Sequence, residues 1–167
     1  MVNYLAEPKQ FASWSTDAAR EVVLRHKGER GPLLEILNDL QGTFGYIHED
    51  AIAILAEELN LSQAEVYGVV TFYKDLRTEA PGGFLVKICR GESCQSVGAD
   101  KLVESAQEVF ETKIGSTNSE RSVTLEEVFC LGNCALSPAI MVDEKLIGRM
   151  SAERIAELAD EIRGVTL

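Results

Sequence analysis

Residues 84–94 read FLVKICRGESC, and this stretch decides how the second half of the chain is interpreted. The run of apolar residues at 84–88 predicts a short, buried β-strand. That strand leads directly into Cys89, and four residues separate Cys89 from Cys94. The stretch therefore places a pair of cysteines in a loop at the end of a strand.

The elements after this strand alternate between helical and strand patterns. Residues 99–110 carry apolar side chains at helical spacing, residues 123–128 predict a second strand, and residues 139–147 predict a short hairpin. We expect Ser151 to cap a last helix. The order β, α, β, β, α is typical of a thioredoxin-like α/β sandwich.

The first 78 residues have a helical pattern instead. The predicted helices are 16–28, 32–42, 49–59 and a fourth that starts after Ser62. The fourth begins with Ser62-Gln63-Ala64-Glu65, which has the spacing of a capping box. Because Pro81-Gly82-Gly83 breaks the helical pattern, we expect two domains, an N-terminal helical bundle over 1–80 and an α/β domain over 81–167.

Composition and charge exclude several classes of function. The chain has 167 residues, of which 46% are hydrophobic, and its 16 basic against 27 acidic residues give a formal charge of −11. This charge would repel nucleic acid and anionic membrane surfaces, so neither is an expected partner. The sequence lacks a membrane-length apolar run, and residues 1–10 lack a signal-peptide pattern. We therefore expect a cytoplasmic protein without direct membrane contact.

All the cysteines of the chain lie in two pairs. Cys130 and Cys134, separated by three residues, follow the second predicted strand as Cys89 and Cys94 follow the first. In a reducing compartment such cysteines are more often metal ligands or catalytic thiols than structural disulfides. Four soft thiolates suit zinc or an iron–sulfur cluster. The gaps are wider than the two-residue gaps of zinc knuckles, which favours a [2Fe-2S] cluster, while zinc and unligated thiols or disulfides remain alternatives.

Three segments resemble a known family. They are 89–94 (CRGESC), 130–138 (CLGNCALSP) and 64–73 (AEVYGVVTFY). Their motifs and order are similar to those of the thioredoxin-like [2Fe-2S] subunits of complex I, NAD-reducing hydrogenases and NAD-dependent, molybdenum-containing formate dehydrogenases. The resemblance extends from about residue 32 to residue 158. It implies a thioredoxin-like [2Fe-2S] ferredoxin domain.

The resemblance also implies a site and a role. Cys89, Cys94, Cys130 and Cys134 correspond to the four ligands of one [2Fe-2S] cluster, and no catalytic residue is expected in this chain. The chain would be an electron-transfer subunit that accepts or stores an electron beside the FMN of a flavin- and NAD-binding subunit. FMN and NAD would then lie on that partner, onto which the N-terminal bundle would dock.

The first cysteine loop suggests which enzyme the subunit serves. It is more similar to the gamma subunit of soluble formate dehydrogenases than to complex I or hydrogenase relatives. The residues that carry this likeness are Arg90, Glu92, Gln95, Ser96 and Gly98. A formate dehydrogenase would add a catalytic partner subunit that holds the molybdenum cofactor. The equivalent subunit of complex I or of an NAD-reducing hydrogenase is the alternative, and a zinc-stabilised interaction module is an alternative from another class.

Several further residues have competing interpretations. Arg90 either favours the reduced cluster through its charge or makes a surface ion pair, and both interpretations stay open. Tyr67, Phe72 and Tyr73 have the spacing of a helix stripe, which is more often part of a core than of an interface. The sequence contains neither a G-x-G-x-x-G motif after a strand nor a P-loop, so we expect no nucleotide site in this chain.

Overall fold

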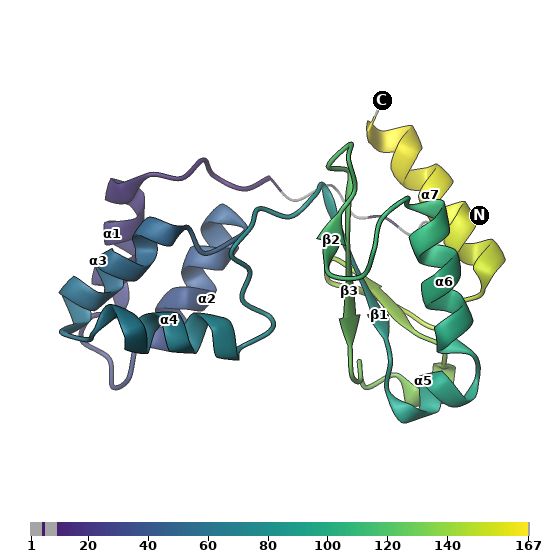
Figure 1. Ribbon diagram of the computed structural model, residues 1–167, viewed down its shortest axis with the longest axis horizontal. Helices are drawn as coiled ribbons and strands as arrows, with labels where there is room; N and C mark the ends of the chain where they lie inside the picture. Colours follow the sequence, from purple (N-terminus) through teal and green to yellow (C-terminus); the bar gives the residue numbers. More distant parts are fainter. Residues whose placement is uncertain (1–4, 6–9, 167) are drawn as a thin grey trace. The chain divides into compact units, whose positions relative to one another are not determined.

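The computed structural model describes Leu5 and residues 10–166, which divide into two compact units (Figure 1). One unit contains residues 10–80, and the other contains residues 81–166 together with Leu5. The boundary between the two larger segments falls between Ala80 and Pro81. Each unit has its own hydrophobic core.

The first unit is a bundle of α-helices. Its helices are α1 (Thr16–His26), α2 (Leu33–Phe44), α3 (Glu49–Leu59) and α4 (Gln63–Phe72). The predicted capping box is confirmed, because the Ser62 hydroxyl accepts the Glu65 N–H and the Glu65 carboxylate accepts the Ser62 N–H. Trp14 packs against the bundle core and stacks on the His48 ring at 4.4 Å.

The prediction that Gly42 ends the second helix is wrong. The helix continues to Phe44, and Gly45 ends it with a φ of 84°, the left-handed conformation that glycine adopts most easily. Leu40 and Phe44 are both buried on the core-facing side of α2. Their packing offsets the cost of an exposed glycine inside the helix, which is about 0.5–1 kcal/mol relative to alanine.

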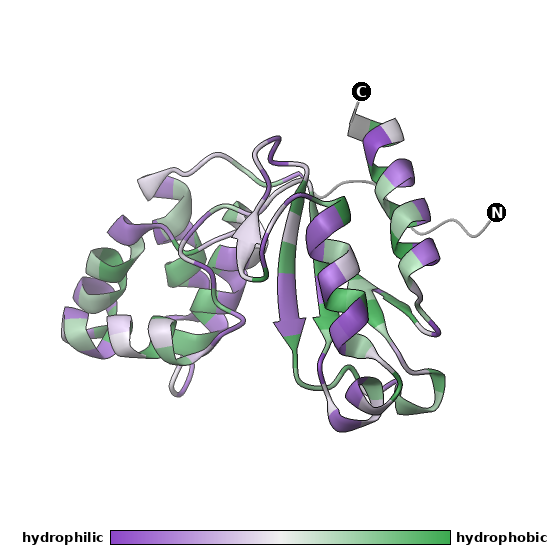
Figure 2. Cartoon of the chain, turned by 45° about the vertical axis from the view of Figure 1, so that its right-hand side comes forward, coloured by the Kyte–Doolittle hydropathy of each residue, from purple (hydrophilic) through white to green (hydrophobic). Residues whose placement is uncertain are grey.

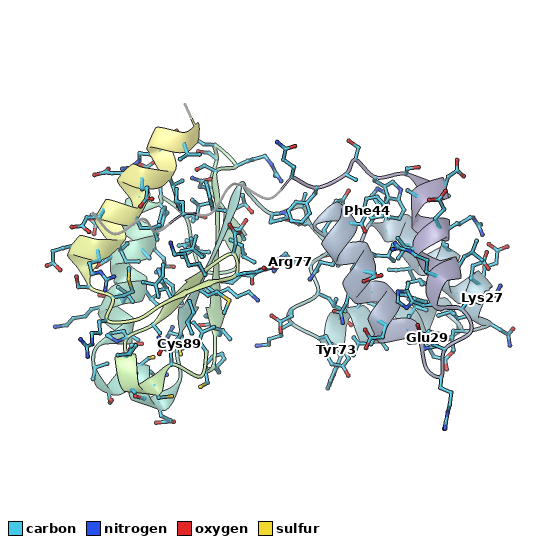
Figure 3. The ribbon with its side chains drawn as sticks, turned by 180° about the vertical axis from the view of Figure 1, so that it is seen from behind. Lys27, Glu29, Phe44, Tyr73, Arg77 and Cys89 are labelled. Carbon is cyan, nitrogen blue, oxygen red and sulfur yellow. The ribbon has the colours of Figure 1, made fainter. Side chains whose placement is uncertain are left out.

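The aromatic residues within and directly after α4 do not form part of the core, although a place in the core was the interpretation that the sequence favoured. Val66 and Val70 are buried, but Tyr67, Phe72 and Tyr73 are 56%, 78% and 43% exposed. The helix ends at Phe72, and Tyr73, labelled in Figure 3, already has an extended conformation. Tyr73 therefore does not occupy the position that it would have in a longer helix.

The second unit is a five-stranded sheet with helices. Its strands are β1 (Phe84–Cys89), β2 (Ser116–Thr117), β3 (Val123–Val128), β4 (Ile140–Val142) and β5 (Lys145–Ile147). Their order across the sheet is β2-β3-β1-β4-β5. β1 and β3 are parallel, and the other neighbours are antiparallel. The two central parallel strands are the ones that lead into the cysteine loops.

Two helices cover one face of this sheet, as Figure 1 shows. They are α6 (Ala99–Val109) and α7 (Ala152–Thr166). Their apolar side chains, such as Leu102 on α6 and Leu158 on α7, join buried strand residues in one core. Figure 2 shows hydrophobic and hydrophilic segments alternating along both helices, as expected for helices with one buried side. The expected α/β fold class is confirmed.

The structure adds elements that the sequence did not indicate. The first cysteine loop contains a short helix, α5 (Glu92–Ser96), and the second contains a 3-10 turn, η1 (Cys134–Leu136). The short strand β2 lies between the predicted helix 99–110 and the predicted strand 123–128, where the sequence indicated neither a helix nor a strand. Within the described part of the chain, no helix is both long enough and apolar enough to span a membrane.

Candidate metal centre

The parallel pairing of β1 and β3 brings the two cysteine loops to one end of the sheet. Cys89, the last residue of β1, lies opposite Val128, the last residue of β3. Arg90 N–H donates to the Val128 carbonyl at 2.7 Å, which keeps the strands paired where the loops begin. Cys94 follows on α5, and Cys134 is the first residue of η1. Figure 3 labels Cys89 at this end of the sheet.

All four cysteines line one cavity of about 550 Å³. Cys89 and Cys94 are buried, each 2% exposed, whereas Cys130 and Cys134 are exposed. The Sγ atoms of Cys130 and Cys134 lie 3.9 Å apart, and all four side chains are free thiols. The cavity therefore has one pair of thiols against the protein core and one pair near the surface.

Backbone N–H groups point at three of the sulfur atoms, those of Cys89, Cys94 and Cys130. The Gly132 N–H donates to Cys130 Sγ at 3.3 Å, and the N–H groups of Gly91 and Leu131 donate to Cys89. The geometry depends on unusual backbone conformations, because Cys130 has a φ of 125° and Gly132 a φ of 74°. Donors of this kind stabilise negative charge on sulfur.

Two serines that sequence reasoning missed join the cysteine loops. The hydroxyls of Ser93 and Ser137 lie 2.9 Å apart. Both donate to the carbonyl oxygen of Cys134, at 3.1 Å and 2.7 Å respectively. Serine is common in loops of any kind, so the sequence contained no signal for this link. The link connects the α5 loop to the η1 loop beside the cavity.

Burial and neighbouring groups shift the pKa values of three of the thiols. Burial raises the pKa of Cys89 despite the N–H groups that favour its thiolate. Burial acts in the same direction on the pKa of Cys94, but hydrogen bonds with Ser137, Cys89 and the Ala139 N–H bring it below the usual thiol value. The hydrogen bond and charge of Cys130 raise the pKa of Cys134. A bound metal centre would favour all four thiolates through its positive charge.

Arg90 lies beside this cluster of thiols and lines the same cavity. Its Nη2 atom lies 2.8 Å from Asp100 Oδ1, and its Nη1 atom lies 3.3 Å from Glu127 Oε2. The expected ion-pair interpretation is therefore correct in part. The Nε atom, however, is buried and has no hydrogen-bond partner among the described residues.

The sulfur atoms do not form a ready single-ion site. Within Leu5 and residues 10–166, no three cysteine, histidine, aspartate or glutamate side chains are arranged so that they could hold one metal ion. The thiols form the two pairs described above instead.

Comparisons with known proteins give consistent results. The family described as "Thioredoxin-like [2Fe-2S] ferredoxin" matches residues 19–163. The NADP-reducing hydrogenase subunit HndA of Solidesulfovibrio fructosivorans is 30% identical over 133 residues, which cover 80% of this chain and 78% of that protein. A subunit of the NADH-quinone oxidoreductase of Mycobacterium tuberculosis is 30% identical over 159 residues, which cover 95% of this chain and 63% of that protein.

A solved structure has a similar fold. It is a chain of an NAD+-reducing [NiFe]-hydrogenase in the air-oxidized state, with a TM-score of 0.69 and 20% sequence identity. The match covers 80% of this chain and 23% of the hydrogenase chain. The chain thus corresponds to only part of that longer polypeptide, and the likeness concerns the fold alone.

Proposed function

The chain belongs to the thioredoxin-like [2Fe-2S] ferredoxin family, and we propose that it is the [2Fe-2S] electron-transfer subunit of an NAD-linked oxidoreductase complex. The observation that carries this proposal is the convergence of all four cysteines on one cavity. When bound there, a [2Fe-2S] cluster supplies reversible one-electron transfer. Cys89, Cys94, Cys130 and Cys134 are the proposed ligands.

The residues present fit such a cluster. Thiolates are the ligands that iron–sulfur clusters take, and a two-iron centre uses two of them on each iron. The 3.9 Å between Cys130 Sγ and Cys134 Sγ is close to the ~3.8 Å between two sulfurs on one tetrahedral metal with ~2.3 Å bonds. The N–H groups on Cys89 and Cys130 add the hydrogen bonds that such sulfurs usually receive.

The proposed partner is a flavin- and NAD-binding subunit, which would hold FMN and NAD. Support comes from the relatives, whose names connect them with NADP-reducing hydrogenase and NADH-quinone oxidoreductase. The exposed Cys130 and Cys134 would let a partner approach one side of the cluster. In this proposal the chain carries an electron but has no catalytic residue of its own, and the complex works in the cytoplasm.

We propose formate dehydrogenase as the complex that this subunit serves, with a molybdenum-containing subunit as catalytic partner. The support is the composition of the first cysteine loop, chiefly Arg90, Glu92 and Gln95. The second candidate is the equivalent subunit of complex I or of an NAD-reducing hydrogenase, and the names of the relatives, an NADH-quinone oxidoreductase subunit and an NADP-reducing hydrogenase subunit, support it. Both candidates give this chain the same electron-transfer role.

Low-temperature EPR of the anaerobically purified chain, reduced with dithionite, tests the electron-transfer proposal. We expect a spin-one-half signal of about one spin per chain, with about two iron and two acid-labile sulfide per chain. Cys130→Ser should lose most of the iron while the far-UV circular dichroism of the helical bundle persists. A folded, zinc-loaded chain that gives no signal would refute the proposal and favour the zinc-stabilised module.

Purification of the native complex through a tag on this chain tests which enzyme it serves. The purified complex is assayed for NAD reduction by formate, NAD reduction by hydrogen, and quinone reduction by NADH. Formate-dependent activity supports the formate dehydrogenase. Activity in either of the other assays, without formate-dependent activity, contradicts it and favours the second candidate.

A further inference from the structure

Arg90 has a buried polar atom that no described residue satisfies. Its Nε atom is buried without a hydrogen-bond partner, and the residue lines the cavity that the four cysteines line. A buried donor without a partner costs free energy, and more so on a charged group, so native proteins rarely leave one unmatched. An acceptor in the cavity, supplied by the bound cluster, would satisfy this N–H.

Two carboxylates hold the guanidinium in place. Asp100, at the start of α6, contacts Nη2 at 2.8 Å, and Glu127, near the end of β3, contacts Nη1 at 3.3 Å. The Arg90 side chain is 26% exposed, so it is screened less than a fully exposed one. These contacts fix the guanidinium at both terminal nitrogens, and the buried Nε–H is one of the donors that they leave without a partner.

We propose that Arg90 raises the reduction potential of the cluster, an inference that rests on the function proposed above. One-electron reduction takes the formal charge of a four-thiolate [2Fe-2S] centre from −2 to −3, with no bond made or broken. The electron comes from a reduced flavin in the complex or from dithionite in the test. A fixed positive charge and an N–H donor stabilise the more negative state more strongly. Asp100 and Glu127 are positioning residues whose charges partly oppose that of Arg90.

The variants separate the charge of Arg90 from its hydrogen bond. Arg90→Gln removes the charge, and we expect the ratio of reduced to oxidised cluster at a fixed potential to fall about tenfold, which is ~59 mV for one electron. Arg90→Lys keeps the charge and should recover at least half of this shift. Asp100→Asn keeps an oxygen that Arg90 can bind but removes an opposing charge, so it should shift the potential in the opposite direction.

Arg163→Gln is the matched control. Arg163 is also paired with a carboxylate, that of Asp160, and it contacts the carbonyl of Val109 at the far end of α6 from the cysteine loops. The C-terminal part of α7, which carries Arg163, lies at the opposite end of this unit from α5 (Figure 1). We expect no shift in this variant, because it changes the net charge equally but at a distance.

The test is an EPR-monitored redox titration of the full chain and its variants, with iron content measured on each sample. If the unaltered chain gives no signal, the proposed function itself fails. If it gives the signal but Arg90→Gln or Asp100→Asn leaves the midpoint unchanged, only the inference about Arg90 fails. An equal shift in Arg163→Gln, or no recovery in Arg90→Lys, also overturns it. Asp100→Asn keeps the test decisive if Arg90→Gln does not hold iron.

Discussion

Gly148 packs against the second cysteine loop so closely that an added methyl group should displace that loop. An alanine Cβ at this position would lie 2.6 Å from Leu136 Cβ, 2.7 Å from the Leu136 carbonyl oxygen and 2.9 Å from Asn133 Nδ2. The first two of these atoms belong to or adjoin the backbone, so no side-chain rotation relieves the contact. Because Leu136 ends η1, which begins at Cys134, the displacement would reach the cavity.

The size of the effect follows from the bonds that a shift would strain. The Arg149 N–H donates to the Leu136 carbonyl at 2.6 Å, and the Met150 N–H donates to the Pro138 carbonyl at 2.9 Å. Overpacking costs about 1–3 kcal/mol, and each weakened hydrogen bond adds up to about 1 kcal/mol. We expect Gly148→Ala to lower the free energy of unfolding by about 2 kcal/mol, or roughly 8–16 °C for a unit of this size.

Differential scanning calorimetry of the full chain, with iron content measured in parallel, checks this prediction. The matched control is Gly42→Ala, which adds the same methyl group inside α2, where nothing lies within 4 Å of the new atom. This control should stabilise the helical unit by about 0.5–1 kcal/mol, because alanine loses less backbone entropy on folding. If Gly148→Ala unfolds at the parent temperature with the parent iron content, the proposed contact with the Cys134 loop is refuted.

Two further predictions concern the helical unit. The hydrogen bond to Asp39, helped by one to Glu29, raises the pKa of His26 above 6.5 against the effect of desolvation. The stabilisation that protonated His26 contributes to folding is therefore complete below about pH 6.5 and is lost as the pH rises through the folded-state pKa. His26→Gln should lower the urea midpoint more at about pH 5.5 than at about pH 9. Equal losses at the two pH values would contradict this prediction. Ser62→Ala should cost about 1 kcal/mol at neutral pH. Hydrogen bonds from the Ser62 backbone and hydroxyl hold the pKa of Glu65 below 4.5. The cost of Ser62→Ala, measured in urea titrations, should therefore shrink as acid protonates Glu65. A cost that stays constant with pH would count against the capping box.

The sequence was sufficient to predict the core elements because their signals are local and repetitive. The apolar run at 84–88 and the capping box at Ser62 each depend on neighbours a few residues away. The helix α5 has five residues, too few to show a helical period, so the pattern could not reveal it. The helix end predicted at Gly42 was wrong because the tertiary packing of Phe44 outweighs the low helix propensity of glycine.

The geometry of the cysteine site could not be predicted in the same way, because long-range contacts determine it. Cys130 has a φ of 125°, which local preference disfavours for any residue with a side chain. Cys130 packs against Gly91, whose Cβ position would lie 3.5 Å from the Cys130 backbone, and Ser93 bonds to the loop 41 residues further along the chain. These contacts form only when β1 and β3 pair, so the sequence can indicate the proposed ligands but not their arrangement. A site held together by contacts between loops should therefore be more sensitive to Gly148→Ala, which acts on one loop from outside, than to substitutions within the helical unit.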